Sequence, residues 1–566
     1  MREELENPVS HFIIDLIERK TGAKDPVVRE YLEKAMQITL DHHTCLSLPS
    51  DPDLEQKLVQ HPAIGGPAEN CPFILFDNKL YLNRYFHMEK EIALMLFDRH
   101  EKQILEPGPD LKTELDRAFD EKNYQQKLAA FMAMTRKLTI ISGGPGTGKT
   151  STVVKILLLA KKLESGLKIK LAAPTGKAAR RLRETLEDVE TKDFSKPEVL
   201  TVHRLLGARL RNQVWKHGQE NKLEADMLII DEASMIDLSL MHHLLSAIPD
   251  HARLILIGDP EQLPSVEAGN VLSDLCYGDQ GFSEGFKQKA EKIIGEFDAP
   301  LKSALPDTIC HLEKSHRFSI NSGIGRLSSA LRNRSMDGYL SDEKVNFEFS
   351  ERKNLTTLLT DHWKEYLGLL SVPEKDMELL SKTFQSVAII CSRRTGTSGS
   401  ARINDEMESL LEDRDIKEPG QEFYHGRPII ITENDYRTGL FNGDTGICFK
   451  DEKTEDFVIK FDGIDKPIPE LEIPKHETCF AITVHKAQGS EFDKVLFVLG
   501  RDGARDNPNL INLEMVYTAV TRAKREITIF SDKETWDKAI SRAADRTGGI
   551  KEQIARIKKE KENHDK

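Results

Sequence analysis

The eight residues Gly143-Gly144-Pro145-Gly146-Thr147-Gly148-Lys149-Thr150 decide what fold this chain adopts. They match the phosphate-binding pattern G-x-x-x-x-G-K-[ST], with an apolar strand-like run before them, at 138–141, and a helical pattern after them. The glycines let the backbone curl so that several N–H groups point at one phosphate, and the helix N-terminus adds a favourable dipole. The stretch therefore predicts a nucleotide site in which Lys149 reaches the β- and γ-phosphates and the hydroxyl of Thr150 binds Mg²⁺.

Two further apolar runs end in polar residues of the kind that hydrolyse a nucleotide. Residues 227–230 read as a buried strand followed by Asp231 and Glu232. At that strand tip Asp231 suits the Mg²⁺ shell, and Glu232 suits the group that orients or deprotonates the attacking water. Residues 254–257 are followed by Gln262, which is placed to sense the γ-phosphate by hydrogen bonding. The alternatives are an acidic pair at a helix N-terminus for the first run and a plain turn for the second.

The composition excludes several classes of protein. A length of 566 residues suggests about three or four domains. The net charge of −13 does not fit a protein coated in positive charge, although a local basic groove can still hold nucleic acid. No run of about 18 apolar residues is present, so a membrane span is excluded, and the acidic start lacks a signal core. Seven cysteines without a C-x-x-C pair argue against a disulfide scaffold, a zinc ribbon and an iron–sulfur motif, and they suit a reducing cytoplasm.

The hydrophobic pattern predicts an α/β protein built from several parts. Short runs of Ile, Leu and Val spaced by helices indicate buried parallel strands in two α/β blocks, at 125–345 and 346–545. Within the second block, alternating segments around Asn442-Gly443 predict a small β-barrel-like insertion at about 415–475. The remaining parts are a small, mostly helical N-terminal domain at 1–105, a linker at 106–124 and a charged tail at 546–566.

The ordered set of motifs over 120–545 resembles superfamily 1 helicases and, within them, the RecD family, the alpha subunit of exodeoxyribonuclease V. Besides the phosphate loop and the strand ends, the resemblance is carried by 173–179 (APTGKAA), 201–206 (TVHRLL), 312–318 (LEKSHRF), 483–492 (TVHKAQGSEF) and 516–524 (VYTAVTRAK). The stretch 439–446 (GLFNGDTG) looks like the signature of the family's inserted β-domain. Residues 387–404 match loosely, and which of Arg393 and Arg394 takes the family role stays open.

The resemblance implies two RecA-like domains with ATP and Mg²⁺ in the cleft between them, an SH3-like insertion, and an N-terminal domain that docks on a RecC-like partner. It implies that the catalytic residues are Lys149, Glu232, Gln262, Arg317 and Arg522, the two arginines stabilising charge on the transferring phosphoryl group. Gln126 looks like the glutamine that reads adenine. The expected ATP contacts are Gln126, Gly143, Gly144, Pro145, Gly146, Thr147, Gly148, Lys149, Thr150 and Ser151, with Thr150 and Asp231 as metal ligands.

DNA would be held by phosphate contacts and base stacking, which are blind to sequence and can be made and broken in each cycle. The expected contacts are Thr175, Lys177, Thr201, His203, Thr483, His485 and Lys486. Taken alone, each of these residues is more simply explained by packing or helix capping, and the resemblance reverses that preference for Thr175, His203 and His485. Phe318 and Tyr517 are placed to stack on bases or adenine, although core packing is the simpler explanation for both.

The leading hypothesis is an ATP-driven 5′→3′ helicase on single-stranded DNA, the motor subunit of a RecBCD-like helicase–nuclease in double-strand break repair and recombination, working in the bacterial cytoplasm at the nucleoid. No convincing metal-binding carboxylate set stands outside the ATP site, so the nuclease is expected in a RecB-like partner, with a RecC-like chain as scaffold. The runner-up is a free-standing 5′→3′ helicase, which usually carries a longer N-terminal extension. A regulatory subunit whose ATP site only switches assembly, and an RNA helicase, remain as alternatives.

Overall fold

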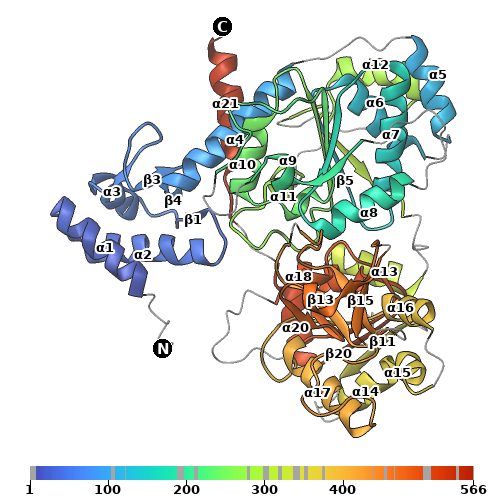
Figure 1. The fold of residues 1–566 in the computed structure, drawn as a ribbon. Helices are drawn as coiled ribbons and strands as arrows, with labels where there is room; N and C mark the ends of the chain where they lie inside the picture. The colour runs from blue at the N-terminus through green and yellow to red at the C-terminus, as the bar shows by residue number, and fades with distance from the viewer. Residues whose placement is uncertain are drawn as a thin grey trace.

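The computed structural model describes residues 8–102, 109–120, 123–187, 197–208, 214–276, 281–297, 305–315, 322–335, 344–349, 355–372, 376–435, 437–451, 456–464, 466–500, 511–543 and 547–564. Figure 1 shows an N-terminal part in blue, an α/β domain in cyan to green, and a second α/β domain in yellow to red. Among the described helices, none combines the length and the apolar character that a bilayer crossing requires.

The N-terminal part combines helices with a small sheet. Its strands follow the order β1-β4-β3-β2, and Asp77 and Asn78, both with positive φ, turn the chain between β3 and β4. Asp25 caps the second helix, because its side chain accepts hydrogen bonds from the N–H groups of Val27 and Val28. Pro26, which has no N–H, occupies the first helical position. The elements are α1 (Pro8–Thr21), α2 (Pro26–Leu40), β1 (Cys45–Ser47), α3 (Pro52–Gln60), β2 (Ile64–Gly65), β3 (Phe73–Phe76), β4 (Lys79–Leu82) and α4 (Asn83–Glu101).

The first α/β domain is built on a six-stranded sheet in the order β10-β5-β9-β8-β6-β7. Every neighbouring pair in it is parallel, and the central strands are buried along their whole length. Its strands are β5 (Leu138–Gly143), β6 (Ile169–Ala173), β7 (Val199–Thr201), β8 (Met227–Ile230), β9 (Arg253–Gly258) and β10 (Ile309–Leu312). Its helices are α6 (Tyr124–Thr135), α7 (Lys149–Leu163), α8 (Gly176–Glu187), α9 (Val202–Leu205), η2 (Ala233–Met235), α10 (Leu238–Ala247), α11 (Val271–Cys276) and α12 (Glu284–Ile294).

The second α/β domain has a five-stranded parallel sheet in the order β11-β20-β19-β12-β18. The two parallel sheets agree with the predicted pair of α/β blocks. The strands are β11 (Val345–Phe349), β12 (Val387–Cys391), β18 (Ala481–Thr483), β19 (Phe492–Val498) and β20 (Ala523–Ser531). The helices are α13 (Gly323–Arg332), α14 (Leu355–His362), α15 (Lys364–Leu370), α16 (Met377–Ser386), α17 (Ser400–Asp413), α18 (Val484–Ala487), α19 (Leu513–Val520) and α20 (Lys533–Ser541).

An antiparallel sheet is inserted between β12 and β18. Its order is β16-β15-β14-β13-β17, and its core contains Ile429, Ile431, Cys448, Ile459 and Phe461. The insertion thus has a small hydrophobic core of its own. Its elements are β13 (Pro428–Ile431), β14 (Thr445–Lys450), β15 (Phe457–Phe461), β16 (Ile468–Pro469), η4 (Glu470–Glu472) and β17 (His476–Thr478).

Three segments differ from the sequence-based outline. Residues expected as a linker form helix α5 (Pro109–Ala118), because its apolar side chains at 111 and 115 are buried against the first domain. Helix α13 falls within the predicted first block, yet its apolar face at 324, 327 and 331 is buried in the core of the second domain. The charged tail contains α21 (Ile550–His564), which lies beside α4 in Figure 1 and buries Ile550 and Ile554.

A polar junction joins the N-terminal part to the segment that leads into α21. Glu89, on α4, is fully buried and accepts a hydrogen bond from the N–H of Gly549 at 2.9 Å. The Thr44 hydroxyl contacts the other Glu89 oxygen and also lies 3.0 Å from the carbonyl of Thr547. The single hydroxyl proton of Thr44 cannot be donated to both the Glu89 carboxylate and the Thr547 carbonyl. If Glu89 is protonated, its carboxyl donates to the Thr44 oxygen, and the Thr44 proton is donated to the Thr547 carbonyl. Burial is the main cause that raises the pKa of Glu89 to about 8.

Candidate ATP site and nucleic-acid interface

A cavity of about 350 Å³ lies between the two α/β domains. The first domain supplies the phosphate loop, α8 and the ends of β8 and β9, while the second supplies the segments before β19 and β20. The lining residues are Pro145, Gly146, Gly148, Lys149, Thr150, Ser151, Ala178, Arg181, Leu182, Asp231, Glu232, Gln262, Gly489, Glu491 and Arg522. Residues far apart in the sequence, and predicted separately, are therefore brought together in one cleft.

The phosphate loop has the backbone that its glycines predict. Gly146 and Gly148 have φ values of 76° and 83°, a region where side chains are disfavoured. The ammonium of Lys149 lies against the loop, donating to the carbonyls of Gly143 at 2.5 Å and Gly144 at 3.1 Å. Gln126 donates to the Thr147 carbonyl at 3.2 Å, which places the predicted adenine-reading residue beside the loop.

The carboxylate pair lies at the end of β8, inside the same cavity. Burial, followed by the charge of Glu232, raises the pKa of Asp231 to about 6. Glu232 has a φ of 52°, a strained value for a residue with a side chain, of the kind that collects at functional sites. The Thr150 hydroxyl lines the same cavity, so two hard oxygen donors are present, which fits Mg²⁺. A divalent cation there would offset the repulsion that Asp231 feels from its neighbour.

The second domain contributes a buried arginine to the cleft. Arg522 donates to the carbonyls of Thr518 at 3.1 Å and Ser490 at 3.2 Å, contacts that hold its guanidinium at the wall of the cavity. From the first domain, Arg181 forms an ion pair with Glu491 across the cleft. Neither Arg181 nor Glu491 is assigned a role by the sequence motifs alone. The available signal was the spacing of Arg181 from Lys177, since residues four apart lie on one face of a helix.

Gln262 connects the cavity to the second domain. Its amide donates to Asp259 at 3.1 Å, and the Tyr517 hydroxyl donates to the same carboxylate oxygen at 3.3 Å. Next to it, the Leu263 N–H donates to the Thr518 hydroxyl at 2.7 Å and its carbonyl accepts from Gln488 at 2.7 Å. Tyr517 is buried in this contact, which agrees with core packing rather than base stacking. Arg317 and Phe318 lie outside the described residues.

The predicted DNA contacts stand at the ends of parallel strands. Thr201 is the last residue of β7 and caps α9 through the N–H of Arg204, and Thr483 is the last residue of β18 and caps α18 through the N–H of Lys486. The same Thr-Val-His pattern thus begins a short helix in each α/β domain. Thr175 follows β6 and accepts from the N–H of Ala178 at 3.2 Å.

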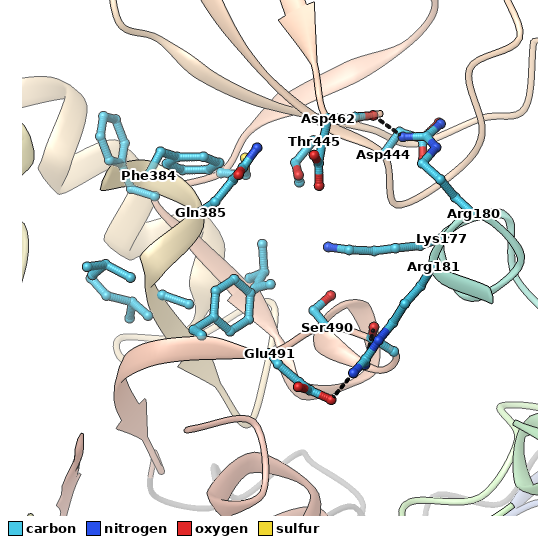
Figure 2. A pocket seen from close by; sticks show the side chains of 18 of the residues that line it. Lys177, Arg180, Arg181, Phe384, Gln385, Asp444, Thr445, Asp462, Ser490 and Glu491 are labelled. Atoms are coloured by element: carbon cyan, nitrogen blue, oxygen red, sulfur yellow. Dashed lines mark hydrogen bonds and ion pairs between the residues drawn. The ribbon is translucent and has the colours of Figure 1, made fainter. Parts of the chain in front are cut away.

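The cationic and imidazole candidates differ in their surroundings. Lys486 pairs with Glu477 at 3.2 Å, and burial lowers the pKa of His203, whose ring lies 5.7 Å from Trp215. His485 is half-buried on α18. Lys177 points into a second cavity, of about 320 Å³, between α8, the inserted sheet and the second domain (Figure 2). Burial also lowers the pKa of Lys177.

The inserted sheet contacts the motif segments of the first domain. Phe441 packs closely on Gly176, since a Cβ placed on Gly176 would lie 2.6 Å from the Cβ of Phe441. The Phe441 ring also faces Arg204, whose guanidinium carbon lies 5.9 Å from the ring centroid. Arg180 forms an ion pair with Asp444 at 2.8 Å, at the upper right of Figure 2. The insertion is therefore anchored to the helix that begins at Gly176.

Known proteins match this chain over the same regions. Residues 126–268 match the AAA domain model and 478–530 match the UvrD-like helicase C-terminal domain model. A RecBCD enzyme subunit RecD of Buchnera aphidicola subsp. Schizaphis graminum (strain Sg) is 31% identical over 523 residues, covering 86% of this chain and 85% of the relative. The ATP-dependent RecD2 DNA helicase of Deinococcus radiodurans is 28% identical over 475 residues, and the aligned region covers 82% of this chain and 57% of that helicase. The Pif1 helicase structure from Candida albicans is 15% identical with a TM-score of 0.41, covering 78% of this chain and 98% of that one.

A phosphate loop, an Asp-Glu strand end and an arginine from a second parallel-sheet domain, all around one cleft, define a two-domain P-loop motor of the helicase class. Within that class, the identity to the Buchnera protein extends over most of both chains. The chain belongs to the RecD family.

Proposed function

We propose that this chain is an ATP-driven helicase that moves 5′→3′ on single-stranded DNA, and that it works in the cytoplasm, at the nucleoid, as the motor subunit of a RecBCD-like complex. The observation that carries the proposal is the cavity lined by both domains. Because Lys149 comes from one wall and Arg522 from the other, both reach a bound nucleotide only when the cleft is closed. Hydrolysis then releases the closure, and alternate opening and closing moves the two domains relative to each other.

The residues of the site divide the work of hydrolysis. Thr150 and Asp231 would hold Mg²⁺, which would supply positive charge against the developing negative charge of the phosphates. Glu232 would orient the attacking water, and Lys149 and Arg522 would stabilise negative charge on the transferring group. Gln126 lies at the loop end where adenine is expected. Arg317 is proposed as the second arginine of the reaction.

DNA is proposed to run across the strand ends that carry Thr175, Thr201 and Thr483. The repeated Thr-Val-His segment provides one DNA contact on each α/β domain. Opening or closing of the cleft would therefore change the distance between the two DNA contacts. The inserted sheet, proposed to be SH3-like, supports this route because Phe441 packs on Gly176 at the start of α8. His203, His485, Lys177 and Lys486 are proposed as further contacts.

The decisive experiment is ATP turnover of the full chain with and without single-stranded DNA, beside Lys149→Gln. We expect DNA to stimulate turnover strongly and the substitution to abolish it, while folding and assembly are retained. Lys162→Gln is the matched control, because Lys162 lies in the last turn of the same helix and forms only an exposed pair with Glu114. Turnover that survives in Lys149→Gln would overturn the assignment of the site.

Assembly with RecB- and RecC-like chains is supported by two observations. The identity to the RecBCD subunit RecD is 31%, against 28% to the RecD2 helicase, which favours the complex-bound form over a free-standing helicase. Helix α1 exposes Val9, Phe12 and Leu16, at 60%, 68% and 44%, on one helical face. Exposed apolar faces of this kind mark contact sites, and we propose that this one docks on the RecC-like chain.

A pull-down tests the docking. We expect Phe12→Asp together with Leu16→Asp to prevent capture by RecB- and RecC-like chains, while Lys20→Ala, on the same helix, leaves capture intact. Turnover of the isolated chain should be unchanged by both. Unchanged capture of the doubly substituted chain would remove α1 from the interface, and no capture of the wild type would favour the free-standing helicase.

A further inference from the structure

Arg332, the last residue of α13, reaches from the second domain to the phosphate loop of the first. A Cβ placed on Gly144 would lie 2.2 Å from an Nη atom of Arg332, so the guanidinium rests directly on the loop backbone. Its helix is anchored in the second domain through buried Ile324, Leu327 and Leu331. The contact therefore crosses the same boundary as the ATP cleft.

The guanidinium is held in place by a short polar chain. Arg332 donates to the Tyr517 hydroxyl at 3.0 Å, which donates in turn to Asp259 at 3.3 Å. The same Asp259 oxygen accepts from Gln262 at 3.1 Å, and Gln262 lines the ATP cavity. Three hydrogen bonds thus connect Arg332 to the predicted γ-phosphate sensor.

The position of Lys149 identifies which end of the nucleotide Arg332 faces. A phosphate-loop lysine reaches the β- and γ-phosphates, and the Lys149 ammonium lies 3.1 Å from the Gly144 carbonyl. Gly144 therefore lies at the terminal-phosphate end of the loop, and Arg332 rests on that residue. A fixed cation at that end interacts more strongly with a triphosphate than with a diphosphate.

We propose that Arg332 is a positioning residue for ATP hydrolysis, which acts through the phosphate loop and through the Tyr517–Asp259–Gln262 chain. Arg332 makes the site prefer a nucleoside triphosphate over a diphosphate. It also couples binding of the triphosphate to closure of the second domain on the first. The inference deepens the proposed function and rests on it for the reaction itself, but the nucleotide preference can be measured without turnover or DNA.

The test compares Arg332→Gln, Arg332→Lys and Tyr517→Phe in the full chain, with Arg326→Gln as control. Arg326 is exposed on the same helix and does not line the ATP cavity. Two quantities are measured: the affinity ratio between a non-hydrolysable ATP analogue and ADP, by fluorescent-nucleotide titration, and kcat and KM for ATP with saturating single-stranded DNA.

We expect Arg332→Gln to reduce the triphosphate preference about tenfold, equivalent to about 1.4 kcal/mol, and to lower kcat more than it changes KM. Arg332→Lys should restore part of the preference. Tyr517→Phe should reproduce the loss, and the double variant should lose no more than either single one, because both act through one contact. A wild-type affinity ratio in Arg332→Gln, or additive losses in the double variant, would overturn the inference. A wild-type chain without DNA-stimulated turnover would instead count against the proposed function.

Discussion

Replacement of Glu89 by Gln should remove a pH dependence from the stability of this chain. The folded-state pKa of Glu89 is raised to about 8 from an ordinary value of 4.5, mainly by burial. A carboxyl with a raised pKa favours folding while it is protonated, so its contribution is complete below pH 4.5 and is lost as the pH rises toward 8. At about 1.4 kcal/mol per pH unit, the total loss is about 5 kcal/mol, and about 2 kcal/mol of it falls between pH 6 and pH 8, because Glu89 is still half protonated at pH 8.

Glutamine fits the same junction. Its carbonyl can accept from the Gly549 N–H and its amide can donate to Thr44, whose proton then serves the Thr547 carbonyl, as with a protonated Glu89. The substitution therefore keeps the hydrogen bonds and removes the ionisation.

The assay is urea unfolding of wild type and Glu89→Gln at pH 6, 7 and 8, with hydrogen exchange of 547–564 to locate the change. The stability difference in favour of Glu89→Gln should grow by about 2 kcal/mol from pH 6 to pH 8. Asp274, whose pKa burial raises to about 7, leaves some pH dependence in both chains, and its charge also helps to raise the pKa of Glu89, so the difference between the chains includes the interaction of the two carboxyls. Parallel curves for the two chains across this range would refute the reasoning.

Three further outcomes are expected. Glu232→Gln should bind ATP normally and hydrolyse it about 10²–10⁴-fold more slowly, measured by nucleotide titration beside steady-state turnover; wild-type turnover would remove Glu232 from its role. Arg522→Ala should slow hydrolysis about 10³-fold or more with little loss of ATP affinity, and normal hydrolysis would mean that the second domain does not complete the site. Asp444→Ala should leave the partly buried Arg180 with only a backbone carbonyl, that of Asp462, in place of its carboxylate partner, at a cost of about 3 kcal/mol, and speed hydrogen exchange at 440–446; unchanged exchange there would contradict an anchoring role for the pair.

The ATP site was predictable from the sequence because its main parts are local. The phosphate loop from Gly143 to Thr150 lies between one strand and one helix, and Asp231 and Glu232 directly follow a buried strand. Parallel strands place such ends along one sheet edge, so proximity followed from the α/β pattern alone. The second-domain Arg522 came from resemblance, since no local spacing indicates which domain faces the loop.

The features that were missed depend on packing between distant segments. Arg332 sits in a helix whose apolar spacing predicts a buried face but does not tell which core receives it. Helix α21 was missed for a similar reason. Most of its residues are charged, so the two isoleucines that pack on α4, Ile550 and Ile554, give only a weak apolar pattern in the sequence. Predicting either contact requires knowing the tertiary neighbours first, because a helical period specifies a face and not its partner.

The junction at Glu89 also affects how the chain is completed during synthesis. Glu89 and Gly549, which close it together, are 460 residues apart. At a translation rate of about 5–20 residues per second, Glu89 leaves the ribosome roughly 20–90 seconds before its partner. During that interval the N-terminal part can close its own core and α4 can pack on α10, but the junction at Glu89 lacks the segment that completes it. The junction is completed only when the segment around Gly549 emerges, so the hydrogen bonding of Glu89 waits for a segment made much later.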